Sequence, residues 1–281
     1  MMNKNGKIIF FDIDGTVWDW NETVPDSTKE AIGILINNGH IPVICSGRAK
    51  AHLMNEALSD MGFRDMVAAC GNYVVADGSV IYERYIGDET IKKIIKLADL
   101  CRIPIVLEGA NKHWVSEKGF EQDDFVDKMY KSMGDSAVRG LRFTPDMRVN
   151  KAAGDILNCS DYAVFKNALS DEFDFIEHGL ALNVNQNPGL EDNAITAVFE
   201  FVPKGTHKAF GINKYCEYRQ VDPRDAIAFG DSVNDIEMFQ CVGYGVAMGN
   251  GTKEIKEIAN YVTDDIHKDG VYKALKYLKL I

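Results

Sequence analysis

Short apolar runs alternate with stretches of helical spacing through the first third of the chain. Ile8–Phe11, Ile41–Cys45 and residues 66–70 are almost continuously apolar, which is typical of strands that are buried on both faces of a parallel sheet. Between these runs, apolar residues recur at helical spacing over residues 25–39 and 51–62. The alternation predicts an α/β fold with a parallel sheet and helices on both of its faces.

The same pattern continues briefly and then returns near the end of the chain. Asp77-Gly78 separates two extended runs, 73–76 and 79–82, and this arrangement predicts a β-hairpin. Beyond residue 194, the pattern predicts strands at 197–202, 226–229, 243–248 and 261–263, with helices at 209–218, from about Thr252, and at 271–280.

The middle of the chain has a different pattern. It predicts a helix at 88–101, extended runs at 103–107 and 180–184, and an acidic-faced helix around 121–131, whereas 145–160 fits neither element. No strand in this segment ends in a polar cluster. We therefore expect a discontinuous core domain, residues 1–83 and 191–281, and an inserted α+β domain, residues 84–190.

Composition excludes several classes of protein. The 281 residues carry a net charge of −11 and no Lys/Arg run, so neither nucleic acid nor an anionic membrane is expected as a partner. Six widely spaced cysteines without a CxxC pair give no support to a zinc or redox motif. The absence of a signal-peptide pattern and of any run near ~18 apolar residues predicts a reduced, cytoplasmic protein. The oligomeric state cannot be predicted.

The first apolar run ends in two aspartates, Asp12 and Asp14, followed by Gly15. Open α/β sheets carry their chemistry where strands end. Two carboxylates this close repel each other, so either one is protonated or a cation lies between them. The alternative is a polar loop that only ends a strand.

Three other predicted elements begin or end in polar residues of different kinds. Ser46 and Gly47 offer a hydroxyl and amides to a phosphate oxygen, although a serine there could instead only cap a helix. Lys208 stands near a helix start, where the helix dipole disfavours a cation, and this hints at an anionic neighbour. The fourth cluster supplies two carboxylates and an amide, from Asp231, Asn234 and Asp235.

Taken together, these side chains suit a magnesium-dependent reaction at phosphorus. Carboxylate oxygens and substrate phosphate are the ligands that Mg²⁺ prefers. A carboxylate beside the metal could attack phosphorus and form an aspartyl phosphate. Hydrolysis of phosphate monoesters is extremely slow without a catalyst, so neutralising charge with a metal and a lysine has a large effect. Nucleotide-binding loops of the GxxxxGK[ST] or GxGxxG type are absent.

Four motifs, in chain order, resemble those of the haloacid dehalogenase superfamily: Asp12-Ile13-Asp14-Gly15-Thr16, Ser46-Gly47-Arg48, Lys208, and Gly230-Asp231-Ser232-Val233-Asn234-Asp235. The position of the insert, between the second and third motifs, is similar to that in the Cof-type, class IIB sugar-phosphatase branch with its C2 cap. Residues 246–250 also resemble a late signature of that branch. The resemblance covers essentially the whole chain and implies a Rossmann-like core.

The resemblance also implies a role for each site residue. Asp12 would be the nucleophile, and Asp14 the general acid and then the general base. Asp12, the main-chain carbonyl of Asp14, and Asp231 would hold Mg²⁺, with Asp235 orienting its waters. The transferring phosphoryl group would be bound by Ser46, the Gly47 amide, Lys208 and Asn234.

We therefore expect a Mg²⁺-dependent phosphatase acting on a small phosphorylated metabolite, a sugar phosphate. A phosphomutase similar to phosphomannomutase and a non-enzymatic phosphate-binding module are the alternatives. The order Gly71-Asn72 departs from the Asn-Gly usual in the branch and leaves substrate contacts from that loop open. We expect His113 and Trp114 to have packing roles and His207 a surface or structural one.

Overall fold

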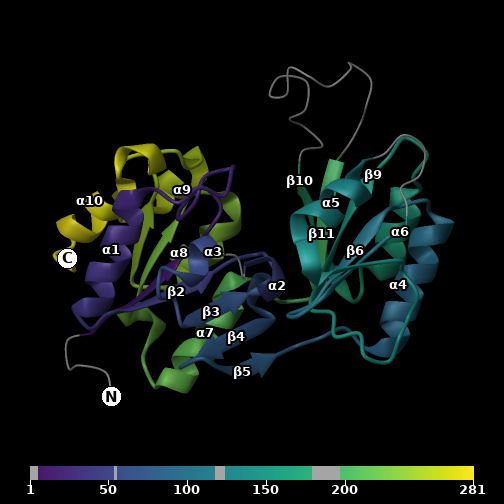
Figure 1. Ribbon diagram of the computed structural model, residues 1–281, viewed down its shortest axis with the longest axis horizontal. Helices are drawn as coiled ribbons and strands as arrows, with labels where there is room; N and C mark the ends of the chain where they lie inside the picture. The colour runs from purple at the N-terminus through teal and green to yellow at the C-terminus, as the bar shows by residue number, and fades with distance from the viewer. Residues whose placement is uncertain (1–5, 54–55, 118–123, 179–196) are drawn as a thin grey trace. The chain divides into compact units, whose positions relative to one another are not determined.

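The computed structural model describes residues 6–53, 56–117, 124–178 and 197–281 (Figure 1). Its contacts divide the chain into two compact units. The core unit comprises Met1–Arg48, Leu53–Glu83 and His207–Ile281, and the insert unit comprises Ala49–His52 and Arg84–Thr206. Within the described part of the chain, every helix is too short or too polar to cross a membrane.

The core unit is built on one eight-stranded sheet. Its spatial order is β14 (Tyr261–Val262), β13 (Tyr244–Ala247), β12 (Ile227–Gly230), β1 (Ile8–Phe11), β2 (Ile41–Cys45), β3 (Asp65–Ala68), β4 (Tyr73–Ala76) and β5 (Ser79–Glu83). The strands from β14 to β3 pair in parallel, and β4 and β5 join them as an antiparallel hairpin. The predicted α/β class, parallel sheet and hairpin are confirmed.

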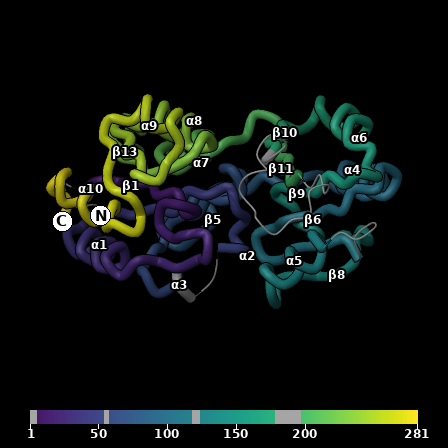
Figure 2. The backbone as a smooth tube through the Cα atoms, turned by 90° about the horizontal axis from the view of Figure 1, so that it is seen from above, coloured from purple at the N-terminus to yellow at the C-terminus, as the bar shows by residue number. Residues whose placement is uncertain are grey.

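Helices cover both faces of this sheet (Figure 2). The core helices are α1 (Asp26–Asn37), α3 (Glu56–Ser59), α7 (Lys208–Arg219), α8 (Ile236–Cys241), α9 (Lys253–Ile258) and α10 (Gly270–Tyr277), with 3₁₀ turns at Ala69–Gly71, Pro223–Asp225, Val233–Asp235 and Ile266–Lys268. Apolar side chains of α7, α8 and α9 pack with Phe10 and Val43 on one face. On the other face α1 contacts α10 (Figure 2). The helix expected at 51–62 is confirmed where the structure describes it, as α2 (Lys50–Leu53) and α3, and residues 54–55 between them lie outside the described part of the chain.

The insert unit is an α+β fold around a six-stranded sheet. Its order is β10 (Phe173–His178), β11 (Ala197–Pro203), β9 (Lys151–Ile156), β6 (Ile105–Glu108), β7 (His113–Val115) and β8 (Ala137–Arg139). All pairs are antiparallel except β7 with β8. Helices α4 (Asp88–Leu100) and α6 (Tyr162–Leu169) pack in one apolar cluster, and α5 (Phe125–Met133) packs in another, beside a 3₁₀ turn at Gly134–Ser136.

Two strands of the insert differ from the sequence-based expectation. β9 falls in the stretch without an assignable pattern, because its six buried residues include Lys151 and Asp155. β11 was expected in the core, which was predicted to resume at residue 191, but it pairs with β9 and β10 in the insert sheet. An apolar strand has the same pattern in either sheet, so its pairing partner is not legible in the sequence. The boundary at 190–191 and the expected run 180–184 lie outside the described residues.

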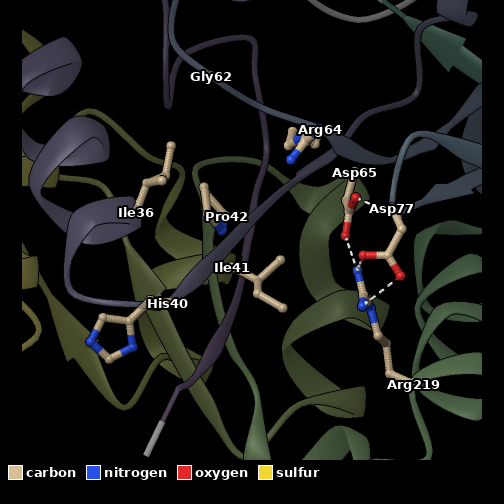
Figure 3. A pocket seen from close by; sticks show the side chains of 9 residues that line it. All are labelled: Ile36, His40, Ile41, Pro42, Gly62, Arg64, Asp65, Asp77 and Arg219. Atoms are coloured by element: carbon tan, nitrogen blue, oxygen red, sulfur yellow. Dashed lines mark hydrogen bonds and ion pairs between the residues drawn. The ribbon is translucent and has the colours of Figure 1, made fainter. Parts of the chain in front are cut away.

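The amino ends of β2 and β3 border a hollow of about 210 Å³ (Figure 3). One wall is an ion-pair network centred on Arg219, whose Nη2 lies 2.6 Å from Asp65 Oδ2 and 2.8 Å from Asp77 Oδ1. The Tyr215 hydroxyl donates to Asp65 Oδ2 at 2.5 Å. This amino-edge network ties the start of β3 and the hairpin turn to the end of α7.

Candidate functional site

The first and fourth predicted clusters are brought together by neighbouring strands. β1 and β12 pair in parallel with Phe11 opposite Phe229, so Asp12 and Asp231 follow them at the same edge of the sheet. The Asp12 amide continues this pairing with a 2.9 Å hydrogen bond to the Phe229 carbonyl. Because the carboxyl ends of parallel strands are where side chains converge, the two carboxylates lie side by side.

Lys208 holds this cluster together from α7. Its Nζ lies 2.5 Å from Asp12 Oδ1, 2.6 Å from Asp235 Oδ1 and 3.3 Å from the Asn234 amide oxygen. The lysine is only 3% exposed. Burial opposes its charge, but Asp12 and Asp235 outweigh burial and hold the pKa of Lys208 above its usual range.

Three carboxylates share this single lysine. Oxygen atoms of Asp12, Asp231 and Asp235 all lie within 4.8 Å of one another. Burial, together with the Asp235 charge, raises the pKa of Asp12 and brings that of Asp231 to about 7. The cluster, which we call the carboxyl-edge cluster, therefore has more negative charge than Lys208 balances, and a divalent cation would relieve it.

The donor set fits Mg²⁺. Asp231 Oδ1 is buried and has no hydrogen-bond partner among the described residues, and an unpaired carboxylate oxygen in that setting is costly unless it meets a cation. Asp235 has a second task, because its Oδ2 accepts the amides of Asp231 and Ser232 at 3.0 and 3.2 Å and fixes the turn. Gly15 has a φ of +79°, and a Cβ there would collide with the Asp231 carboxylate. The residues present thus fit the expected metal.

The position of Lys208 depends on a close approach of two backbones. Gly71 has a φ of +91°, and a Cβ on it would collide with the His207 carbonyl and the Gly211 amide. Glycine at 71 thereby lets α7 pack directly on the 3₁₀ turn after β3, which gives the Gly71-Asn72 order a packing reason. His207 is the N-cap of α7, its Nδ1 accepting from the Phe210 amide at 3.3 Å. Its expected structural role is confirmed.

The Asp14 side chain is held by residues outside the carboxyl-edge cluster. Arg48 binds it with two hydrogen bonds, Nε to Oδ2 at 3.0 Å and Nη2 to Oδ1 at 2.7 Å. The Trp18 indole N–H donates to Asp14 Oδ1 at 2.9 Å, and Arg48 Nη1 also contacts Glu22 Oε1 at 2.6 Å. Sequence reasoning gave these three partners no role. The only available signal was the place of Arg48 in the second motif. A metal contact from the Asp14 carbonyl stays a prediction.

The second predicted cluster lies beside the first. Ser46 is buried at the end of β2, which pairs with β1. Its Oγ accepts the Arg48 amide at 3.1 Å, so the hydroxyl closes a turn and does not cap α2. Gly47 follows in that turn, in contact with Cys70 Sγ. The contacts therefore join Lys208, Asp12, Asn234 and Asp235 directly, whereas binding of phosphate by Ser46 and Gly47 stays a prediction.

Asn250 is a further residue without a predicted role. Its Nδ2 donates to the Gly15 carbonyl at 2.7 Å, and its Oδ1 accepts the Ile266 amide at 3.0 Å. The side chain thus fastens the turn after Asp14 to the loop after β14. Its place in the late signature was the only hint.

His113 and Trp114 belong to the insert sheet. Both are buried, and Trp114 packs in the main apolar cluster of the insert. Burial and the nearby Lys151 lower the pKa of His113 to about 4, so the ring is neutral. Its ring centroid lies 6.2 Å from that of His52. The predicted packing role is confirmed for Trp114.

Comparisons with known proteins agree on one family. The model of the haloacid dehalogenase-like hydrolases matches residues 9–275. A putative phosphatase, YkrA, of Bacillus subtilis is 32% identical, with 99% of each chain covered. The 5-amino-6-(5-phospho-D-ribitylamino)uracil phosphatase YitU of the same organism is 27% identical over 98% of each chain. The solved structure of the subclass IIB sugar phosphatase BT4131 has a TM-score of 0.75 at 24% identity, covering 98% of this chain and all of that one.

Proposed function

The chain belongs to the haloacid dehalogenase-like hydrolases and is a phosphatase of that family, and we propose that it hydrolyses a sugar phosphate or a similar small metabolite with Mg²⁺, through an aspartyl phosphate. One observation carries the proposal. Asp12 is buried in direct contact with Lys208 and beside two further carboxylates. An ionised carboxylate in that setting can act as a nucleophile. Lys208 places one cation beside it, and the neighbouring carboxylates would bind a second, Mg²⁺.

In the first step, an Asp12 oxygen forms a bond to phosphorus while the bond from phosphorus to the leaving oxygen breaks. Asp14 gives its proton to that oxygen, so the product leaves as a neutral alcohol. In the second step, Asp14 takes a proton from water, and the hydroxide oxygen attacks the aspartyl phosphate. Inorganic phosphate leaves, and Asp12 is again a carboxylate.

The remaining residues of the site bind the charged phosphoryl group or would bind the metal ion. Lys208 favours the ionised form of Asp12, against the opposing effects of burial and Asp235 on its pKa, and lies within reach of a phosphoryl oxygen. Asn234, Ser46 and the Gly47 amide supply further donors to that group. Asp12 and Asp231, with the Asp14 carbonyl, would hold Mg²⁺, and Asp235 would orient its waters. When bound, Mg²⁺ supplies charge neutralisation at the phosphoryl oxygens.

The substrate class is supported by the names of two relatives. One acts on a phosphoribityl compound and the other is called a sugar phosphatase, so both names point to a phosphate on a polyhydroxylated chain. With a net charge of −11 the protein as a whole repels such an anion. Lys208 and the metal are therefore the attractive charges on which binding would depend.

Asp12→Asn tests the proposal. We expect phosphate release from a panel of sugar phosphates and from p-nitrophenyl phosphate to fall by more than about 10³-fold, because the amide is not a competent nucleophile. Asp77→Asn, a change of the same kind in the amino-edge network, should keep wild-type turnover. A chelator should abolish wild-type activity, and Mg²⁺ should restore it. Near wild-type turnover by Asp12→Asn would refute the nucleophile assignment, and accumulation of a sugar bisphosphate in place of free phosphate would identify a mutase.

A further inference from the structure

Arg48 makes an unusually complete set of contacts around Asp14. Its Nε and Nη2 bind the two Asp14 oxygens, at 3.0 and 2.7 Å, and its guanidinium carbon lies 5.1 Å from the centre of the Trp18 ring. A two-point bond between guanidinium and carboxylate fixes the plane as well as the position of the carboxylate. A lysine offers only a point charge and could not do this.

From this geometry we infer that Arg48 is a positioning residue for proton transfer, one that sets where the Asp14 carboxyl group stands relative to the leaving oxygen. The inference rests on the proposed function, since it assumes that Asp14 handles protons. It goes further by assigning a task to a residue that does not itself exchange a proton or touch phosphorus.

Glu22 holds Arg48 in place independently of Asp14. Its Oε1 lies 2.6 Å from Arg48 Nη1, the nitrogen that does not bind Asp14. When Asp14 carries its proton and is neutral, Arg48 therefore keeps an anionic partner and stays in place beside Asp14. The Glu22 backbone is itself held, because Asp19 Oδ1 accepts the amides of Asn21 and Thr23 on either side of it, at 2.9 and 3.0 Å.

Substrates with different leaving groups distinguish a positioning role of Arg48 from a general structural role. Phenoxide is a basic leaving group and profits from a well-placed proton, whereas 2,4-dinitrophenoxide is stable as an anion and needs none. Hydrolysis of the aspartyl phosphate is common to both substrates, and kcat/KM leaves it out because it covers only the steps up to departure of the leaving group. In kcat/KM, a residue that positions the proton donor should therefore matter for phenyl phosphate and much less for 2,4-dinitrophenyl phosphate. Loss of the fold or of phosphate binding would affect both substrates equally.

The experiment measures kcat and KM of Arg48→Met, Arg48→Lys and Glu22→Gln on both substrates, with Asp14→Asn as the benchmark. For Arg48→Met we expect kcat/KM to fall about tenfold more on phenyl phosphate than on 2,4-dinitrophenyl phosphate. Arg48→Lys should keep part of the activity, and Glu22→Gln should show the same selectivity at about two- to threefold. Arg219→Met removes another arginine from a carboxylate pair and should leave the ratio of the two rates unchanged.

An equal loss of kcat/KM on both substrates for Arg48→Met, with a selective loss for Asp14→Asn, would overturn the inference and leave the proposed function intact. If Asp14→Asn itself lost kcat/KM equally on both substrates, the assignment of Asp14 as acid would fail, and the proposed mechanism with it. Arg48→Lys allows the same comparison if Arg48→Met does not fold.

Discussion

Carboxylates gather at both edges of the core sheet, and the two groups differ in how their charge is balanced. In the amino-edge network, Asp65 Oδ1 accepts the Asp77 amide and Oδ2 accepts from Arg219 (Figure 3). Asp65 Oδ2 also accepts from the Tyr215 hydroxyl. In the carboxyl-edge cluster, three carboxylates share one lysine, and Asp231 Oδ1 lacks a partner among the described residues. One group is satisfied by the protein itself, and the other is not.

The difference separates a structural arrangement from a functional one. A buried carboxylate with all its hydrogen bonds made is compatible with stability. A buried cluster with excess charge lowers stability, and perturbed pKa values of this kind are typical of sites that bind or react. We therefore expect the stability of the fold to depend on Arg219 and the reaction to depend on Lys208. Both cations lie on α7, and each is paired with two aspartates.

The largest effect is expected from Lys208→Met. Removing the ammonium should lower kcat/KM by about 10²- to 10³-fold, the usual effect of losing a preorganised charge at a reacting group. Without metal it also leaves three carboxylates unbalanced, so the melting temperature in chelator should fall and Mg²⁺ should restore more of it than in the wild type. Phosphate release and thermal unfolding measure the two effects. Retained activity would show that Lys208 is only structural.

Arg219→Met should have the opposite result, a loss of stability without a loss of activity. It leaves Asp65 buried without its cation, and breaking such a pair costs about 3 kcal/mol, since the remaining charge is uncompensated. Denaturant unfolding should show that loss, while kcat/KM per folded molecule stays at the wild-type value. Arg64→Ser, at an exposed arginine lining the same hollow, is the control and should change stability by less than about 0.5 kcal/mol. A loss of activity without a loss of stability would contradict the comparison.

The last effect is a pH dependence of the metal-free protein. Burial and Asp235 raise the pKa of Asp231 to about 7, against about 3.9 in an unfolded chain. Between these values the folded state binds more protons than the unfolded state, so the free energy of unfolding falls as pH rises from about 4 to about 7. Asp231→Asn should remove the contribution of Asp231 to this decrease in the free energy of unfolding. Urea unfolding in the presence of a chelator measures it. If wild type and Asp231→Asn gave parallel curves, Asp231 would be ionised throughout.

Much of the fold was predictable from apolar periodicity. β1 and β2 are continuous apolar runs, and α7 has helical spacing, so their types follow from the sequence. β9 and β11 were harder to predict. Lys151 interrupts the apolar pattern of β9, and the pattern of β11 fits a strand of either sheet. Which sheet a strand joins is decided by contacts between residues far apart in the chain, and periodicity does not carry that information.

The site, too, has residues that could be predicted from the sequence and contacts that could not. Residues at strand ends, such as Asp12 and Asp231, were predictable because parallel pairing brings strand ends together. The contact between Arg48 and Asp14 was not, since it depends on the path of two loops and on side-chain orientation. Residue type and order showed that carboxylates and a lysine would meet, but not which carboxylate each cation would bind.

The central place of β1 has a consequence for synthesis on the ribosome. Its partner β12 begins only at Ile227, so at 5 to 20 residues per second β1 waits roughly 10 to 40 s for that neighbour. The insert strands all precede β12, and the last of them ends at Pro203. The insert sheet is therefore complete in the nascent chain while Ile8–Phe11, wholly apolar, still has an open edge. In that interval the nascent chain exposes an unpaired apolar edge to aggregation, and the edge belongs to the strand that Asp12 follows.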